Sequence, residues 1–159
     1  MNKDMLLYIA IKNRVERSNM EDSLVLDGID VTSFPSAAKL WEAFQIKPAQ
    51  FIITDRRFAD MFDGLKLARA IRKHFMLPYV FIVVRSAMSS LDDVKQGMAA
   101  GVDDYIIKPH NQLQIRSRVL VGKRWLEYIN SLNQAGERTA AARRVGASQA
   151  VAADPVGAA

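Results

Sequence analysis

Three polar side chains in this sequence stand where an apolar run ends. Asp55 ends the run at residues 50–55, Ser86 stands just beyond the run at 79–84, and Lys108 closes the run at 104–107. A carboxylate nucleophile, a hydroxyl donor and an ammonium group form a set that suits the chemistry of an anionic group. The alternative for Asp55 is an acid that only caps a helix or sits in a loop.

The three apolar runs have the β-branched and aromatic composition of buried strands. Two more strands are expected at residues 5–11 and 29–34. The helical patterns between the runs cover residues 14–27, a segment capped by Ser36, a segment starting at Asp63-Gly64, residues 90–101 and residues 112–132. Strands that alternate with helices predict an α/β fold, with a parallel sheet and helices on both faces. The carboxyl ends of parallel strands share one side of the sheet, so the three polar residues are expected to converge there.

Two helical patterns lead to specific expectations about burial. In the helix at 90–101, Leu91, Val94 and Met98 are expected to point inward. In the helix at 112–132, the apolar row has near-heptad spacing and comprises Ile115, Val119, Gly122, Leu126 and Ile129. This row predicts a homodimer through residues 112–132; the alternative is that it only packs on the sheet. Residues 1–132 are expected to form the domain, and residues 133–159 a flexible tail rich in alanine and glycine.

Composition limits the kinds of site that the chain can carry. The 159 residues include no cysteine, so neither a disulfide framework nor a thiolate zinc site is available, and two histidines make a histidine-based metal site unexpected. No apolar run approaches the ~18 residues that span a bilayer, and no secretory signal is apparent, so a cytoplasmic protein is expected. The formal charge of +5 suits an acidic partner or nucleic acid, or else reflects a solvated basic helix.

The most specific motif of the chain is Ala100-Gly101-Val102-Asp103-Asp104-Tyr105-Ile106-Ile107-Lys108-Pro109. Together with Asp63-Gly64-Leu65, and with Ser86-Ala87 placed fifteen residues before Gly101, it resembles the receiver domain of two-component response regulators. The resemblance covers about residues 5–130 and implies a flavodoxin-like domain with five strands, of the kind seen in chemotaxis regulators.

This resemblance also implies roles for the three polar residues. Asp55 would accept a phosphoryl group from a partner histidine kinase, and Ser86 and Lys108 would contact that group. The bond between Lys108 and Pro109 would be cis, which is uncommon even before proline. Tyr105 would stand at the aromatic switch position of the family, although it also fits an ordinary aromatic residue at the sheet edge.

The chain departs from the family pattern where Mg²⁺ would bind. Two acids are expected after the first strand, and Lys12 and Asn13 stand there instead. The loop after Asp55 is also longer than usual, which is expected to displace the carbonyl of Arg57 from the metal site. An oxygen-seeking cation therefore loses its ligands. We expect Lys12 to project its ammonium group toward Asp55 or, alternatively, to extend into solvent.

These departures lead to two hypotheses about function. The first is a pseudo-receiver: a binding module that acts through protein–protein contacts, is not an enzyme and needs no cofactor. The second is an active receiver that uses Mg²⁺ and is phosphorylated on Asp55 by a histidine kinase. A nucleotide-binding enzyme fits less well, because no glycine-rich phosphate loop follows the first strand. Nucleic acid is an unlikely partner, since little chain follows residue 132 to form a DNA-binding domain.

Overall fold

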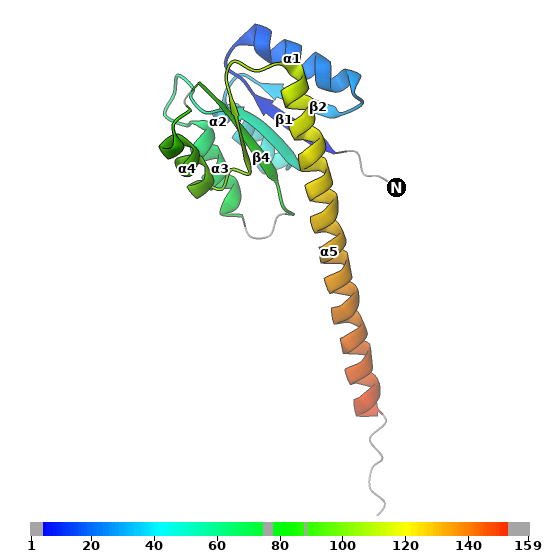
Figure 1. Ribbon diagram of the computed structural model, residues 1–159. Helices are drawn as coiled ribbons and strands as arrows, with labels where there is room; N and C mark the ends of the chain where they lie inside the picture. Colours follow the sequence, from blue (N-terminus) through cyan, green and yellow to red (C-terminus); the bar gives the residue numbers. More distant parts are fainter. Residues whose placement is uncertain (1–4, 75–77, 88, 153–159) are drawn as a thin grey trace, which may run out of the picture. The chain divides into compact units, whose positions relative to one another are not determined.

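The structure is a computed structural model that describes residues 5–74, 78–87 and 89–152. In this part of the chain, strands and helices alternate from end to end (Figure 1). The elements are β1 (Leu6–Ala10), α1 (Arg14–Leu26), β2 (Asp30–Phe34), α2 (Ala37–Ile46), β3 (Phe51–Asp55), α3 (Gly64–Arg72), β4 (Phe81–Ser86), α4 (Leu91–Ala99), β5 (Asp104–Ile107) and α5 (Gln112–Ala152). The strands pair in parallel to form one five-stranded sheet in the order β2-β1-β3-β4-β5. The predicted doubly wound α/β fold is therefore confirmed.

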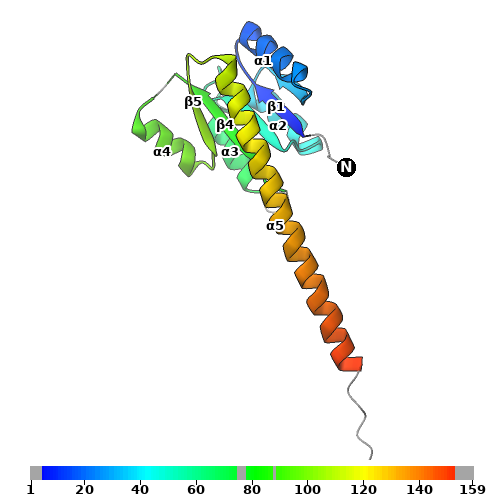
Figure 2. The same ribbon diagram turned by 45° about the vertical axis from the view of Figure 1, so that its right-hand side comes forward.

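Helices cover both faces of this sheet. On one face α2 and α3 pack through residues such as Leu40, Phe44 and Leu67. On the other face α1 and the first part of α5 pack through residues such as Met20 and Val119, and Figure 2 shows these two helices on the same side. A strand such as β3 is buried on both faces, which is why its sequence shows no alternation of polar and apolar residues.

Short polar side chains fix where the helices start. The side chains of Asn13, Ser36, Asp63 and Ser90 accept hydrogen bonds from backbone N–H groups in the first turns of α1, α2, α3 and α4. These bonds satisfy donors that have no partner inside the helix. Because most of these helices start soon after the carboxyl end of a strand, their first turns line the same side of the sheet as the predicted site.

Helix α4 differs from the sequence expectation in the face that it buries. Leu91 and Met98 were expected to point inward but are 68% and 45% exposed, so the expectation is wrong for these two residues. It is confirmed for Val94, which is partly buried and packs against the core. The helix instead buries Asp93 and Gly97. The reason is the ring of Tyr105, which lies so close that a Cβ atom at Gly97 would come within 3.1 Å of it.

The apolar row of α5 packs on the sheet, which was the alternative to a dimer contact in the sequence analysis. Ile115, Val119, Gly122 and Leu126 are buried. A Cβ atom at Gly122 would collide with the rings of Phe51 and Phe81, so the helix approaches the strands more closely than a larger residue allows. Dimerisation of residues 112–132 stays a prediction, and it would have to use other side chains.

Helix α5 is much longer than expected. The chain divides into two compact units, residues 1–126 and residues 127–159, and α5 contributes to both. The helix was expected to end near Leu132 but continues to Ala152, and almost all described side chains after Glu127 are exposed. Many of these residues are alanines, which favour helix without needing a core.

The flexibility of 133–159 stays a prediction, and residues 153–159 lie outside the described part. No helix among the described residues is long and apolar enough to cross a membrane.

Candidate functional site

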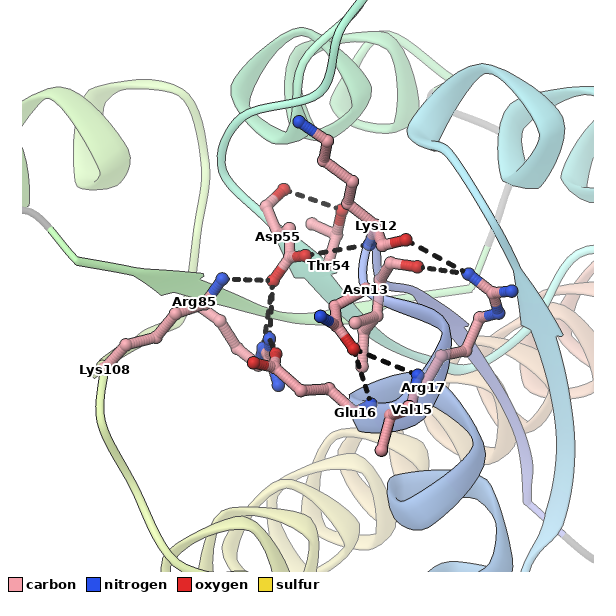
Figure 3. A network of polar contacts seen from close by, with 10 residues as sticks. Lys12, Asn13, Val15, Glu16, Arg17, Thr54, Asp55, Arg85 and Lys108 are labelled. Carbon is pink, nitrogen blue, oxygen red and sulfur yellow. Dashed lines mark hydrogen bonds and ion pairs between the residues drawn. The ribbon is translucent and has the colours of Figure 1, made fainter.

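Asp55 lies at the end of β3 and is only 3% exposed. Its Oδ1 atom accepts a hydrogen bond from Arg85 Nε at 3.0 Å and forms ion pairs with Arg85 Nη2 at 2.9 Å and Lys108 Nζ at 3.0 Å (Figure 3). Its Oδ2 atom accepts a hydrogen bond from the backbone N–H of Lys12 at 3.0 Å. The carboxylate therefore already has three protein partners, and two of them are cations.

Arg85 is the residue that sequence reasoning missed. It is the fifth residue of β4, on the same face as Phe81 and Val83, and pairs in register with Asp55 on β3. Its guanidinium group is among the most buried side chains of the protein, and its Nη2 atom also forms an ion pair with Glu16 at 2.6 Å. A five-donor guanidinium group can bind two carboxylates at once, which an ammonium group does less well.

The expectation for Lys12 is wrong in its main point. Lys12 contributes its backbone N–H to Asp55, but within the described residues its ammonium group forms no ion pair with that carboxylate. Figure 3 shows the side chain extending away from the carboxylate, as the alternative had it. The physical reason is that Arg85 already fills the space beside Asp55, while a lysine stem reaches solvent at low cost.

Asn13 has a structural role in the neighbouring turn. Its Oδ1 atom accepts hydrogen bonds from the backbone N–H groups of Val15 and Glu16, both at 3.0 Å, and so caps α1. This cap holds the first turn of α1, and with it Glu16, next to Arg85. Glu16 therefore reaches the site through Arg85 and not by a direct contact with Asp55.

The other residues expected at the site are close to Asp55 or to its loop. Ser86 is buried at the end of β4, and its carbonyl accepts a hydrogen bond from the backbone N–H of Lys108 at 2.8 Å. The Lys108–Pro109 bond is cis, as the resemblance implied. Arg57 is exposed in the loop that follows β3. That loop returns to the strand end at Gly64, where a Cβ atom would collide with the carbonyl oxygen of Asp55.

On the other face of the sheet, Tyr105 is held by a second buried arginine. Its hydroxyl accepts a hydrogen bond from Arg56 Nη1 at 2.9 Å, and the tyrosine is 9% exposed. Arg56 Nη2 also donates to Gln96 Oε1 at 2.8 Å, and Nη1 donates to the carbonyl of Asp93 at 3.3 Å. Arg56 directly follows Asp55, so the group that holds Tyr105 inward is adjacent in the chain to the candidate acceptor at the end of β3.

His110 lies beside the same cluster, just before α5. Burial lowers the pKa of His110 from its usual value, and the positive charge of Arg85 lowers it further. Its Nδ1 atom is buried and has no hydrogen-bond partner within the described residues. Both effects disfavour the protonated imidazole relative to an exposed histidine.

The residues of this site do not fit Mg²⁺. The positions expected to carry its two acids are Lys12 and Asn13, and the amide oxygen of Asn13 is used as a helix cap. Both carboxylates nearby, from Asp55 and Glu16, bind Arg85. In the part of the chain that the structure describes, no group of three or more acids and histidines is arranged to hold a metal ion.

Two sequence signals point to the residues that were missed. The buried run of β4 continues past Val84, and the two-residue period from Phe81 places Arg85 on the core face beside Asp55. A buried arginine next to a buried acid indicates an ion pair. For Arg56 the signal is weaker, because a residue after a strand end can turn either way until the loop is known.

Comparisons with known proteins agree with this geometry. A family model described as the response regulator receiver domain matches residues 10–120. The transcriptional regulatory protein KdpE of Staphylococcus aureus is 32% identical over 105 residues, which are 66% of this chain and 44% of KdpE. The TorCAD operon transcriptional regulatory protein TorR of Escherichia coli O157:H7 is 30% identical over 129 residues, which are 81% of this chain and 53% of TorR. The chain thus spans about half the length of these relatives.

Among solved structures, the chemotaxis response regulator CheY4 of Vibrio cholerae has a similar backbone. The TM-score is 0.70 at 17% sequence identity, and the match covers 76% of this chain and 99% of CheY4. At this identity the likeness shows the fold alone. The order and pairing of the strands described above are those of a flavodoxin-like receiver domain.

Proposed function

The chain belongs to the receiver domain family of two-component response regulators, and we propose that it signals as a pseudo-receiver, a binding module independent of Mg²⁺-assisted phosphorylation. The observation that carries this proposal is the buried guanidinium group of Arg85, which binds Asp55 through two nitrogen atoms. In this arrangement a fixed protein cation stands beside the carboxylate, where a receiver that uses Mg²⁺ needs a metal ion.

The charges of the cluster support this proposal. Two acids, Asp55 and Glu16, face two bases, Arg85 and Lys108, so the formal charges sum to zero without a bound ion. A divalent cation would add two positive charges next to a buried guanidinium group that cannot lose its proton. Its entry would require Arg85 to leave Asp55, and leaving a buried charge without a partner is costly.

The position of Tyr105 supports the same proposal. Arg56, Gln96 and Asp93 form a buried polar network around its hydroxyl group, and Gly97 leaves room for its ring. The tyrosine is thus held inward by protein groups alone. We therefore propose that the surface formed by α4, β5 and α5 keeps one conformation and binds its partner, a histidine kinase or another signalling protein, without a phosphoryl signal.

A second candidate function is an active receiver that is phosphorylated on Asp55 by a histidine kinase. Lys108 favours it, because its ammonium group is 3.0 Å from the carboxylate and would neutralise charge on a transferred phosphoryl group. In this case Arg85 would replace part of the charge that Mg²⁺ normally supplies.

Labelling by a small phosphodonor separates the two functions. We would incubate the protein with acetyl phosphate, with and without Mg²⁺, and measure its intact mass. The unaltered protein is expected to gain no phosphoryl group under either condition. Mg²⁺-dependent gain of one phosphoryl group, absent from the Asp55→Asn variant, would refute the pseudo-receiver.

A restoration variant tests the reason for the loss. The triple change Arg85→Val, Lys12→Asp and Asn13→Asp removes the competing cation and returns two acids, and aspartate still caps a helix at position 13. This variant is expected to bind Mg²⁺ in a titration and to accept a phosphoryl group on Asp55. The pair of aspartates without Arg85→Val is the matched control, and it is expected to bind Mg²⁺ more weakly.

A further inference from the structure

A hollow between α2 and α3 lies outside the Asp55 cluster and has a volume of about 350 Å³. Within the described residues it is lined by Trp41, Phe62, Lys66, Arg69, Ala70, Lys73 and His74. The lining thus combines aromatic and small apolar groups with several basic side chains. None of these residues carries a carboxylate, so the charged side chains that line the hollow are all basic.

The apolar part of the hollow centres on Trp41. Its ring stacks on Phe44 at a centroid distance of 5.9 Å and lies 5.5 Å from the ring of His74 at a tilt of 43°. Trp41 is half-buried, so part of the indole faces the hollow. Because rings already flank the indole, a nucleobase could not stack on it without displacing His74, whereas an aliphatic side chain could pack against its exposed part.

The basic part of the hollow is a row along α3. Lys66 and Arg69 lie in α3, and Lys73 is the C-cap residue directly after it. The three are three and four residues apart, so they follow one face of the helix over about 10 Å. The ammonium group of Lys66 donates to the carbonyl of Met61 at 2.6 Å. The side chains of Arg69 and Lys73 are exposed, and in the described part of the chain they form no hydrogen bond or ion pair.

We propose that this hollow binds an acidic helical segment of a partner protein. A large aliphatic side chain of that segment packs against Trp41 and Ala70, and acids one helical turn apart pair with Arg69 and Lys73. The charge complementarity and the helical spacing of the basic row favour this occupant over a small anion. The inference adds a second binding surface, separate from the one formed by α4, β5 and α5, to the proposed pseudo-receiver and rests on that proposed function.

A designed peptide tests the hollow directly. The probe is a labelled helical peptide of about 15 residues with one leucine and with glutamates spaced three and four apart on the same face. A peptide with glutamine in place of glutamate is its control. Fluorescence anisotropy measures affinity, and backbone NMR shifts show where the peptide binds.

Two variants separate charge from shape. Arg69→Glu with Lys73→Glu is expected to weaken binding at least about tenfold, or roughly 1.4 kcal/mol, and added salt is expected to weaken binding of the unaltered protein. Ala70→Leu fills the hollow without changing charge and is expected to weaken binding by a similar factor. Arg124→Glu changes an exposed arginine of α5 instead and is expected to leave the affinity within about twofold.

The outcomes decide the proposal in both directions. Saturable binding of the acidic peptide, with shifts in α2 and α3 and the expected order of variants, supports it. The proposal would be overturned if the peptide did not bind, or if Arg124→Glu lost as much affinity as the Arg69 and Lys73 variant. It would also be overturned if ATP, but not the peptide, caused shifts at α2 and α3, because that result would indicate a nucleotide site. Phosphorylation of Asp55 would overturn the pseudo-receiver and leave the peptide result unchanged, so the two failures are distinguishable.

Discussion

Breaking the ion pair between Arg85 and Asp55 is expected to destabilise the protein strongly, whereas removing both charges is not. Arg85 is 2% exposed and holds Asp55 through contacts of 2.9 and 3.0 Å. Loss of one partner of a buried pair costs about 3–5 kcal/mol, because the other charge is left without a partner. In Arg85→Met, Lys108 at 3.0 Å still compensates Asp55 in part, so we expect a loss of roughly 2–4 kcal/mol.

A double-mutant cycle measures this effect. Arg85→Met, Asp55→Asn and the double variant are compared by urea unfolding followed by circular dichroism. The double variant leaves neither charge of the pair buried alone, and Glu16, whose side chain is 50% exposed, returns to water. The free energies of unfolding are therefore expected to depart from additivity by roughly 1–3 kcal/mol.

An exposed pair in the same chain provides the control. Lys39 and Glu42 form an ion pair at 3.3 Å, and both side chains are more than half exposed. The cycle Lys39→Met and Glu42→Gln is expected to give a coupling of about 0.3–0.5 kcal/mol. If the Arg85 and Asp55 variants were additive to within about 0.5 kcal/mol, the buried cation would not hold Asp55 and our reasoning about the metal site would be refuted.

Three other changes have expected outcomes. Gly122→Ala should lower the free energy of unfolding by roughly 1–3 kcal/mol in chemical denaturation, because its Cβ atom meets Phe51 and Phe81, whereas Gly136→Ala in open space should raise the helicity of α5. Burial lowers the pKa of His110 in the folded protein below the unfolded value of about 6.5, so the unfolded chain takes up a proton more readily. The free energy of unfolding should therefore be fully present above the unfolded pKa and should fall as pH drops through the folded pKa. This fall should be smaller in His110→Gln. Leu120 is exposed on α5, so Leu120→Glu should reduce any dimer seen by light scattering at high concentration; a dimer unchanged by it would exclude this face.

The fold could be predicted because each buried run and each helix cap is a local signal. Strand β5 begins and ends where the sequence predicts. Gly28 and Gly101, which were predicted to close two helices, have positive φ values of 79° and 94°. The length of α5 could not be predicted from apolar periodicity, because the part after Leu132 buries almost nothing and depends on intrinsic helix propensity. The burial of Leu91 and Met98 on α4 was predicted wrongly, because the face that this helix buries depends on Tyr105, a residue of another element.

The site could be predicted in its positions but not in its contacts. Parallel strands necessarily bring Asp55 and Lys108 to the same side of the sheet, and the structure places them 3.0 Å apart. Which cation lies closest depends on side-chain packing that no local pattern specifies. Lys12 stands at the position of a lost acid, but Arg85 enters from the neighbouring strand and is already buried on the correct face.

In the proposed pseudo-receiver, two arginines next to Asp55 take the place of the contacts that a phosphorylation switch would change. Arg85 points to the face covered by α1 and α5 and supplies a permanent positive charge to the carboxylate. Arg56 reaches the other side of the sheet and holds Tyr105 through its hydroxyl group. Because both guanidinium groups are buried and always charged, neither contact depends on a transferred group. The proposal that this receiver presents one fixed surface therefore follows from both sides of the sheet, and not from the altered metal positions alone.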